Sequence, residues 1–363
     1  MTRRENLLRA IRFERPDWVP TTFHINDACW HSYPQDFLFD QMEAHEFLFP
    51  GFVRPAGRFT PDYAAVARRD EPFLDDWGCL WRTQDDGITG IVTKHPLGDW
   101  SAFDSYIAPD PERRMGIGPV DWDAEAAGFA AAVAGGEAAV GSLRHGHTFL
   151  QLCDIRGYES LVYDMADGEP RLRRLVAMLE DFNAEMVRRL LAAGAEIIAI
   201  PEDLGAQTGP MISPQWFREY IKPSYGRLVR LARDGGALVH MHSDGHLHAL
   251  IDDIVDEGNG GGVDVMNLQD LVNGIDWIAA RFGGRAGAGS DGRRRICVEL
   301  DVDRQSVTAS GSPAQIDALI REEVEKLGSR DGGLMMIFGL YPGLPLENVA
   351  AVMDAMQKHA FHH

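Results

Sequence analysis

The chain has 363 residues, of which 45% are hydrophobic and 25% are charged, and its formal net charge is −20. This length suffices for one large α/β barrel or two medium domains, and the negative charge disfavours binding to nucleic acids or anionic membranes. The four cysteines show no CxxC spacing, so we expect no disulfide framework. No apolar signal-peptide core follows the N-terminal residues and no apolar stretch reaches the length of a membrane span, and we therefore expect a cytoplasmic protein.

The first 125 residues predict one helix, one strand and an irregular insertion. Residues 2–13 are typical of a helix, because Thr2 and Glu5 fit a capping box and the apolar residues have helical spacing. A buried strand is expected at residues 18–24. Residues 30–125 are rich in Trp, Pro, Asp and Gly and have weak periodicity, so we expect a lid, with a hairpin near residues 79–95.

From residue 126 onward, predicted strands and helices alternate regularly. Strands are expected at residues 148–152, 195–200, 237–240, 263–267, 296–300 and 334–338. Helices are expected at residues 124–134, 158–165, 170–193, from Ser213, 246–256, 274–282, 313–327 and 346–360. Such alternation indicates parallel βαβ units, and the apolar strands indicate burial on both faces. Seven to eight units fit and no glycine-rich turn follows the first predicted strand, which favours a single (β/α)8 TIM barrel over a doubly wound sheet.

Polar side chains follow nearly every predicted strand. In a (β/α)8 barrel the catalytic groups lie at the carboxyl ends of the strands. Each residue alone could simply cap a loop, but together they point to one mouth. The expected catalytic residues are Glu202, Asp203, His240, His242 and Asp244, and the expected substrate-binding residues are His24, Asn26, Arg156, Gln207, Asn267, Gln269 and Tyr341.

The segment from His240 to His242 carries the sharpest chemical signal. Histidines two apart on a strand point to the same face, and neutral imidazoles in that arrangement can share a metal ion. We expect His240, His242 and Glu202 as ligands of a divalent metal such as zinc, with Asp244 as an alternative to Glu202. Hydrogen-bonded or acid–base histidines without metal are the other interpretation. Arg156 is the candidate clamp for a substrate carboxylate.

Several segments resemble the uroporphyrinogen decarboxylase superfamily, especially its methyltransferase-like branch. They are residues 1–20, Asp203–Gln207, Met211–Pro214, Phe217–Pro223, His242–Gly245, Asp303–Gln305, Gly311–Pro313 and Pro345–Asn348. The resemblance covers nearly the whole chain and is weakest over residues 30–125. It implies a (β/α)8 barrel that acts in methyl transfer to a corrinoid or a thiol, or in porphyrinogen decarboxylation.

Two departures from this resemblance bear on the chemistry. The arginine-rich stretch that binds porphyrinogen carboxylates in the decarboxylases has no counterpart around Phe23–Trp30. The zinc methyltransferases use a His-x-Cys pair and a distant cysteine, whereas this chain has His240-Met-His242 and, near the last strand, Gly339-Leu-Tyr341. A site without thiolates is harder and better suited to oxygen or nitrogen substrates.

Three functions follow as hypotheses. The first is a methyltransferase or demethylase that exchanges methyl groups between a small substrate and a corrinoid on a partner protein, or another acceptor. The second is a decarboxylase or lyase acting without metal on a small or tetrapyrrole carboxylic acid. The third is a catalytically reduced binding subunit.

We expect no nucleic-acid or membrane partner and consider a homodimer possible in a barrel of this size. Aromatic residues that could wall the pocket are Trp30, Trp77, Trp81 and Tyr341.

Overall fold

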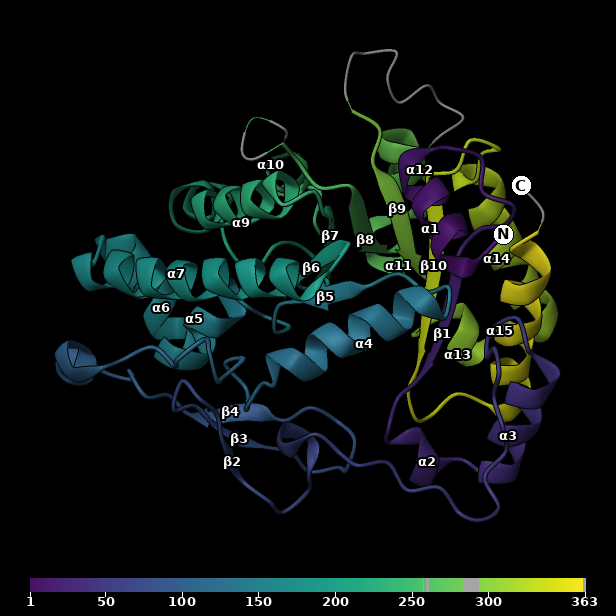
Figure 1. The fold of residues 1–363 in the computed structure, drawn as a ribbon, viewed down its shortest axis with the longest axis horizontal. Coiled ribbons are helices and arrows are strands. Elements are labelled where there is room, and N and C mark those ends of the chain that lie inside the picture. The colour runs from purple at the N-terminus through teal and green to yellow at the C-terminus, as the bar shows by residue number, and fades with distance from the viewer. Residues whose placement is uncertain (257, 259–260, 284–293, 362–363) are drawn as a thin grey trace.

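The computed structural model describes residues 1–256, 258, 261–283 and 294–361 (Figure 1). Its main sheet is parallel and curled, with the order β1-β10-β9-β8-β7-β6-β5. The strands are β1 (Thr21–Ile25), β5 (Val140–Ser142), β6 (Ile197–Asp203), β7 (Leu238–Asp244), β8 (Val265–Gln269), β9 (Cys297–Asp301) and β10 (Leu334–Leu340). Within the described residues this sheet has seven strands rather than the eight of a closed barrel, and β1 and β5 form its edges.

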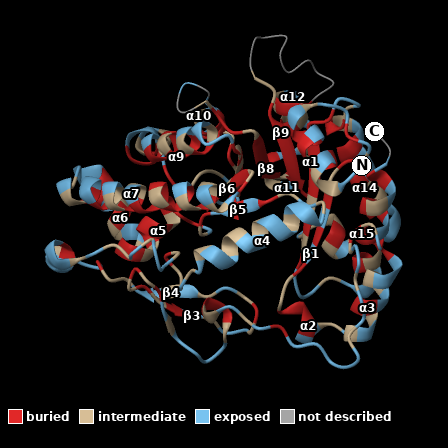
Figure 2. Cartoon of the chain, in the orientation of Figure 1, coloured by how far each residue is buried: buried red, intermediate tan, exposed pale blue. Residues whose placement is uncertain are grey.

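Helices surround the sheet, and buried residues concentrate in the strands and the helix faces turned toward them (Figure 2). The helices are α1 (Arg3–Arg12), α2 (Cys29–Ser32), α3 (Gln35–Ala44), α4 (Trp122–Ala134), α5 (Phe149–Arg156), α6 (Tyr158–Asp167), α7 (Pro170–Ala193), α8 (Pro214–Trp216), α9 (Lys222–Asp234), α10 (Ile251–Val255), α11 (Asp270–Asn273), α12 (Ile275–Phe282), α13 (Val307–Ser310), α14 (Pro313–Leu327) and α15 (Leu346–His359). A π-helical turn, Phe217–Ile221, joins α8 to α9. No helix in the described part of the chain is long and apolar enough to cross a bilayer.

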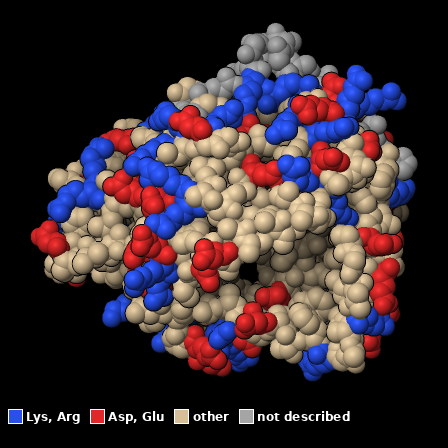
Figure 3. Space-filling view, viewed as in Figure 1, with Lys and Arg blue, Asp and Glu red and all other residues tan. Residues whose placement is uncertain are grey.

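The lid contains a small antiparallel sheet, β2 (Phe73–Leu74), β3 (Leu80–Arg82) and β4 (Ile91–Lys94), in the order β2-β3-β4. Its β3–β4 pair confirms the hairpin predicted near residues 79–95. Short 3-10 turns at Ala65–Ala67 and Trp100–Ser105 complete this part of the chain. Charged side chains of both signs are scattered over the face of the molecule seen in Figure 3, between larger areas of other residues, and this face is hollowed near its centre.

The strand predicted at residues 148–152 is wrong. Residues 149–156 form helix α5, and the strand that precedes it is β5, only three residues long. Phe149, Leu152 and Ile155 are all fully buried, so the amphipathic pattern that would mark a helix is missing. A short apolar segment of this kind cannot be told from a buried strand by periodicity alone.

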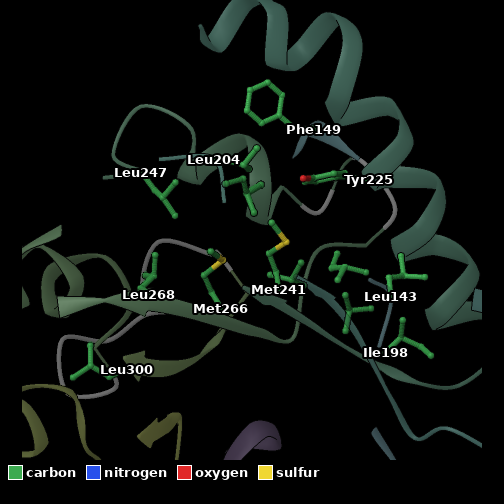
Figure 4. Packing of buried hydrophobic residues seen from close by; sticks show 14 of the residues in the cluster. Leu143, Phe149, Ile198, Leu204, Tyr225, Met241, Leu247, Met266, Leu268 and Leu300 are labelled. Atoms are coloured by element: carbon green, nitrogen blue, oxygen red, sulfur yellow. The ribbon is translucent and has the colours of Figure 1, made fainter. Parts of the chain in front are cut away.

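Alternation along the strands separates the inside of the curled sheet from its outside. At the amino ends, the inward side chains form a small apolar cluster with α1: Leu7, Ile11, Ile197, Leu238, Val265, Cys297 and Met335. Helix α1, whose predicted capping box from Thr2 to Glu5 is present, therefore closes this end. Outward side chains such as Met241, Met266 and Leu300 pack in the main core (Figure 4). The polar inward residues are left for the carboxyl ends, where a site is expected.

Candidate active site

A cavity of about 770 Å³ opens at the carboxyl ends of the strands. Its lining residues come from the strand ends and from the lid: His24, Val66, Trp81, Thr89, Gly90, Ile91, Val92, Ile117, Arg144, His145, Leu150, Asp154, Asp203, His242, Asp244, Asp301, Arg304, Ile337, Gly339 and Tyr341. The lid thus covers the mouth with largely apolar side chains. Of the aromatic residues expected to wall a pocket, Trp81 and Tyr341 line the cavity, whereas Trp30 and Trp77 belong to the core.

Three potential metal ligands converge in this cavity. His145, Asp203 and His242 each offer one ligand atom, and these atoms lie within 4.8 Å of one another. The Oδ1 atom of Asp203 lies 3.4 Å from His145 Nε2 and 3.5 Å from His242 Nε2. Two imidazoles and one carboxylate are a donor set that divalent zinc and similar cations accept. Of the three ligands expected from the sequence, only His242 belongs to this group.

A buried hydrogen-bond chain fixes the orientation of His242. Asn267 Nδ2 donates to Glu299 Oε2 at 2.8 Å, so its Oδ1 faces His242 Nδ1 at 2.6 Å. Although Glu299 is buried, the charge and hydrogen bond of His240 lower its pKa, which keeps this carboxyl group an acceptor. His242 Nδ1 must therefore carry a proton, and Nε2 is directed to the ligand cluster, where a metal ion would take the place of the Nε2 proton.

The charges around His242 favour a cation at this position. Although burial opposes charge on the ring, the hydrogen bond to Asp203 and the charge of Asp244 raise the pKa of His242 to about 9. Asp203 is also buried, yet hydrogen bonds from His145 and His242 hold its pKa well below the usual range. Asp244 Oδ1, 3.6 Å from His242 Nε2, is buried without a hydrogen-bond partner among the described residues. A buried carboxylate oxygen that has no hydrogen-bond partner and lies beside the His242 imidazole fits a metal ion at this position.

A close approach of two loops places these carboxylates. Gly205 follows β6 and Gly245 follows β7, and the Gly205 amide donates to the carbonyl of Asp244 at 3.1 Å. A Cβ atom on Gly245 would lie 2.2 Å from the backbone of Gly205, and the φ angle of Gly245 is +86°. Only glycine fits there, so Asp203 and Asp244 are held side by side.

Asp301 and Arg304 form a second polar group in the cavity. Arg304 Nη2 lies 2.9 Å from Asp301 Oδ2 and 3.8 Å from Asp244 Oδ2, and its guanidinium lies 5.5 Å from the ring centre of Tyr341. Burial raises the pKa of Asp301 to about 7. The negative charge of Asp244 adds to this increase, whereas the positive charge of Arg304 opposes it. Asp301 can therefore donate or accept a proton near neutral pH.

Two residues expected to be catalytic lie below the mouth. His240 donates from Nε2 to Glu299 Oε2 at 2.8 Å and does not line the cavity. Glu202 is fully buried and accepts hydrogen bonds from the amide of Phe149 at 2.5 Å and from the hydroxyl of Tyr225 at 2.8 Å. It caps the amino end of α5, and burial raises its pKa to about 7.

The expected substrate-binding residues are divided between the mouth and its surroundings. His24 and Tyr341 line the cavity, and Asn267 supports His242 from beneath. Gln269 accepts a hydrogen bond from the Gly245 amide and lines a separate pocket of about 20 Å³. Asn26 accepts from the Ala28 amide within a turn, and Gln207 is exposed outside the cavity lining.

Arg156 is not placed to clamp a substrate carboxylate. Its guanidinium is buried, binds Asp164 at 2.7 Å, and donates to the carbonyls of Leu97 and Gly98. The arginine that does line the cavity from this region is Arg144. Arg144 and His145 escaped prediction because the strand was placed at residues 148–152 instead of Val140–Ser142. The same strand-end rule applied after Ser142 selects both.

Comparisons with known proteins agree with this architecture. A model of the uroporphyrinogen decarboxylase (URO-D) family matches residues 2–359. No curated protein matches the chain significantly in sequence. Among solved structures, a methyltransferase from Methanosarcina mazei is similar, with a TM-score of 0.67, 18% identity and coverage of 99% of both chains. A 3-keto-D-glucoside 4-epimerase from E. coli has a TM-score of 0.37 and 14% identity over 74% of this chain and 95% of its own, too low a similarity to carry an argument.

At 18% identity the methyltransferase shows a shared fold and leaves the reaction open. The family model is stronger, since it extends from the capping residue of α1 to the last residue of α15. The chain belongs to the uroporphyrinogen decarboxylase family.

Proposed function

We propose that this protein is a metal-assisted methyltransferase or demethylase that removes a methyl group from an oxygen or nitrogen atom of a small substrate. The convergence of His145, Asp203 and His242 within 4.8 Å inside the cavity is the observation that carries the proposal. The same-fold methyltransferase adds support, though not for the substrate. A corrinoid held by a partner protein is the acceptor we expect, and zinc is the metal we would test first.

The donor set indicates which methyl compounds suit the site. All four cysteines are buried and free, and none belongs to the ligand cluster found among the described residues. Without thiolate ligands, a bound divalent ion is a harder Lewis acid that polarises an oxygen or nitrogen atom of the substrate. The protein's own task is then to position that atom near His145 and His242.

Transfer of the methyl group leaves an oxygen or nitrogen atom that must take a proton. Asp301 lines the cavity, and its pKa of about 7 makes it able to supply one. Arg304, 2.9 Å from Asp301, would stabilise the carboxylate that results. Asp301 is therefore the general acid in this proposal.

A decarboxylase acting without metal is the second candidate. Asp301 could protonate a carbanion, and the buried Arg144 could hold the carboxylate of the substrate. The third hypothesis, a binding subunit, would be favoured by a mouth blocked by side chains, and the cavity of about 770 Å³ speaks against it.

Methyl transfer can be measured with free cob(I)alamin as acceptor and a panel of methoxylated and N-methylated compounds as donors. We expect visible absorbance to report methylcobalamin formation by the wild-type protein and at least a ~100-fold lower rate for Asp301→Asn, the loss typical of a missing general acid. Asp303→Asn is the matched control, since Asp303 caps α13 through the Ser306 amide and is no part of the cavity lining. Decarboxylation of acids by wild-type protein that transfers no methyl group would contradict the proposal.

A further inference from the structure

We propose that Arg144 binds a carboxylate group of the substrate, so that the protein acts on small organic acids with an apolar body. This inference rests on the proposed function, because it names the class of substrate for the same cavity.

Arg144 is a buried cation whose hydrogen-bonding capacity is largely unused. Its side chain is 8% exposed and lines the cavity, and its Nη2 atom lies 2.6 Å from Asp154 Oδ2. The Nε and Nη1 atoms have no partner among the described residues. The guanidinium carbon lies 5.1 Å from the ring centre of Trp81, which also lines the cavity. Burying guanidinium N–H groups without acceptors is costly, so such groups need an explanation.

Arg156 shows that the unused donors are not a general feature of buried arginines in this chain. Its side chain is 9% exposed and, like Arg144, pairs with one aspartate, Asp164. It also donates to two backbone carbonyls, those of Leu97 and Gly98, and has no buried nitrogen without a partner. Arg156 is outside the cavity lining, and Arg144 is within it. The arginine with spare donors is therefore the one that lines the cavity.

Charge selects a carboxylate over a more highly charged group. The cavity is lined by Asp154, Asp203, Asp244 and Asp301, and the charge of Arg304 is shared between the last two. One guanidinium already paired with Asp154 matches a singly charged planar group better than a dianionic phosphate.

The rest of the lining defines the body of the substrate. Apolar side chains make up much of the wall: Val66, Trp81, Ile91, Val92, Ile117, Leu150 and Ile337. A volume of about 770 Å³ accommodates a molecule of the size of a substituted aromatic acid. The carboxylate would bind at Arg144 while the methylated atom lies near His145 and His242.

The proposal can be tested by calorimetric titration with matched acid and amide pairs. The probes are acetate, benzoate, 4-methoxybenzoate and indole-3-acetate, each with its neutral amide, and phenyl phosphate. We expect the wild-type protein to bind at least one acid about 10-fold or more tightly than its amide, the gain of one charge-assisted contact. This preference should vanish in the double variant Arg144→Gln, Asp154→Asn, which removes both charges and leaves none unpaired.

The matched control is Arg156→Gln, Asp164→Asn, which removes the other buried pair and should keep the acid preference. Arg144→Lys retains a folded ion pair, and we expect it to lose several-fold in preference because lysine lacks the planar donors. If the double variant Arg144→Gln, Asp154→Asn does not unfold cooperatively on heating, it is not properly folded. The acid preference of Arg144→Lys is then the test of the proposal.

Three results would overturn the proposal: no acid bound more tightly than its amide, an acid preference unchanged in the Arg144 variants, or phenyl phosphate bound more tightly than every carboxylate. Metal content is measured separately on the same preparations. The wild-type protein could bind no metal and still show an acid preference that depends on Arg144. This result would contradict the proposed metal-assisted function but would support carboxylate binding by Arg144.

Discussion

At the scale of single residues, depth within the sheet decides which of two similar side chains reaches the cavity. His240 and His242 are two apart on β7 and share a face, but only His242 reaches the cavity. His240 lies one layer deeper, where Glu299 holds it. The sequence could identify the face, because the alternation of a strand is fixed. It could not identify the depth, which depends on the register with β8 and β9.

The hydrogen bond from His242 to Asn267 gives a testable consequence. In Asn267→Ala, the Nδ1 proton loses its acceptor and the ring is no longer held for ligation. We expect zinc affinity, measured by competition with a chelating dye, to fall by about 10–100-fold. Asn183→Ala is the control, since Asn183 is also buried but donates to the carbonyl of His147, away from the ligand cluster. Unchanged affinity in Asn267→Ala would show that this contact does not support a metal site.

At the scale of elements, long periodic segments were predictable and short ones were not. Helices α7 and α14 have the predicted bounds of 170–193 and 313–327, and proline stands at the first helical position of each. The three-residue strand β5 carries too little pattern to be recognised, and α5 is too uniformly buried. That single error moved the expected clamp from Arg144 to Arg156 and hid His145.

The cap on α5 predicts the effect of changing Glu202. In Glu202→Gln, an amide group replaces the carboxylate that accepts from Phe149 and Tyr225. We expect the free energy of unfolding in urea to fall by about 1–3 kcal/mol, while the metal content stays at the wild-type level. The adjacent Asp203→Asn should instead lose the metal, because Asp203 belongs to the ligand cluster and does not cap α5. A stable Glu202→Gln protein without metal would restore Glu202 as a ligand.

A buried carboxyl group on helix α14 predicts how the stability of the protein depends on pH. Glu323 of α14 is fully buried, and this burial, with the neighbouring carboxyl of Asp270, raises its pKa well above its ordinary value of 4.5. The folded protein then retains a proton that the unfolded chain releases, so stability falls as pH rises above that ordinary value. Each unit of raised pKa corresponds to about 1.4 kcal/mol.

Glu323→Gln removes this titration. We expect the variant to be more stable than the wild type at pH 8–9 by about 1 kcal/mol or more and to lose less stability between pH 5 and pH 9, as measured by urea unfolding. Glu322→Gln, at a side chain 54% exposed on the same helix, should follow the wild-type curve. Parallel curves for wild type and Glu323→Gln would mean that Glu323 is not held neutral.

At the scale of the whole molecule, alternating strands and helices sufficed to place the candidate site at one end of a parallel sheet. The cavity lies on that side because every strand contributes its carboxyl end to it, whatever the number of strands. The lid could not be described beyond its hairpin, because residues 30–125 have little periodicity and pack through scattered aromatic residues such as Trp81. Its place over the mouth depends on tertiary contacts that no local pattern encodes.

The most direct test of this account is the metal content of four purified proteins, measured by elemental mass spectrometry after growth with ample zinc. The proteins are the wild type, His145→Ala, His242→Ala and the matched control His240→Gln, whose side-chain amide can still donate a hydrogen bond to Glu299. The account predicts about one equivalent of a divalent metal in the wild type and in His240→Gln, and loss of metal in the other two. Metal retained in His242→Ala, or a wild type without metal, would contradict it.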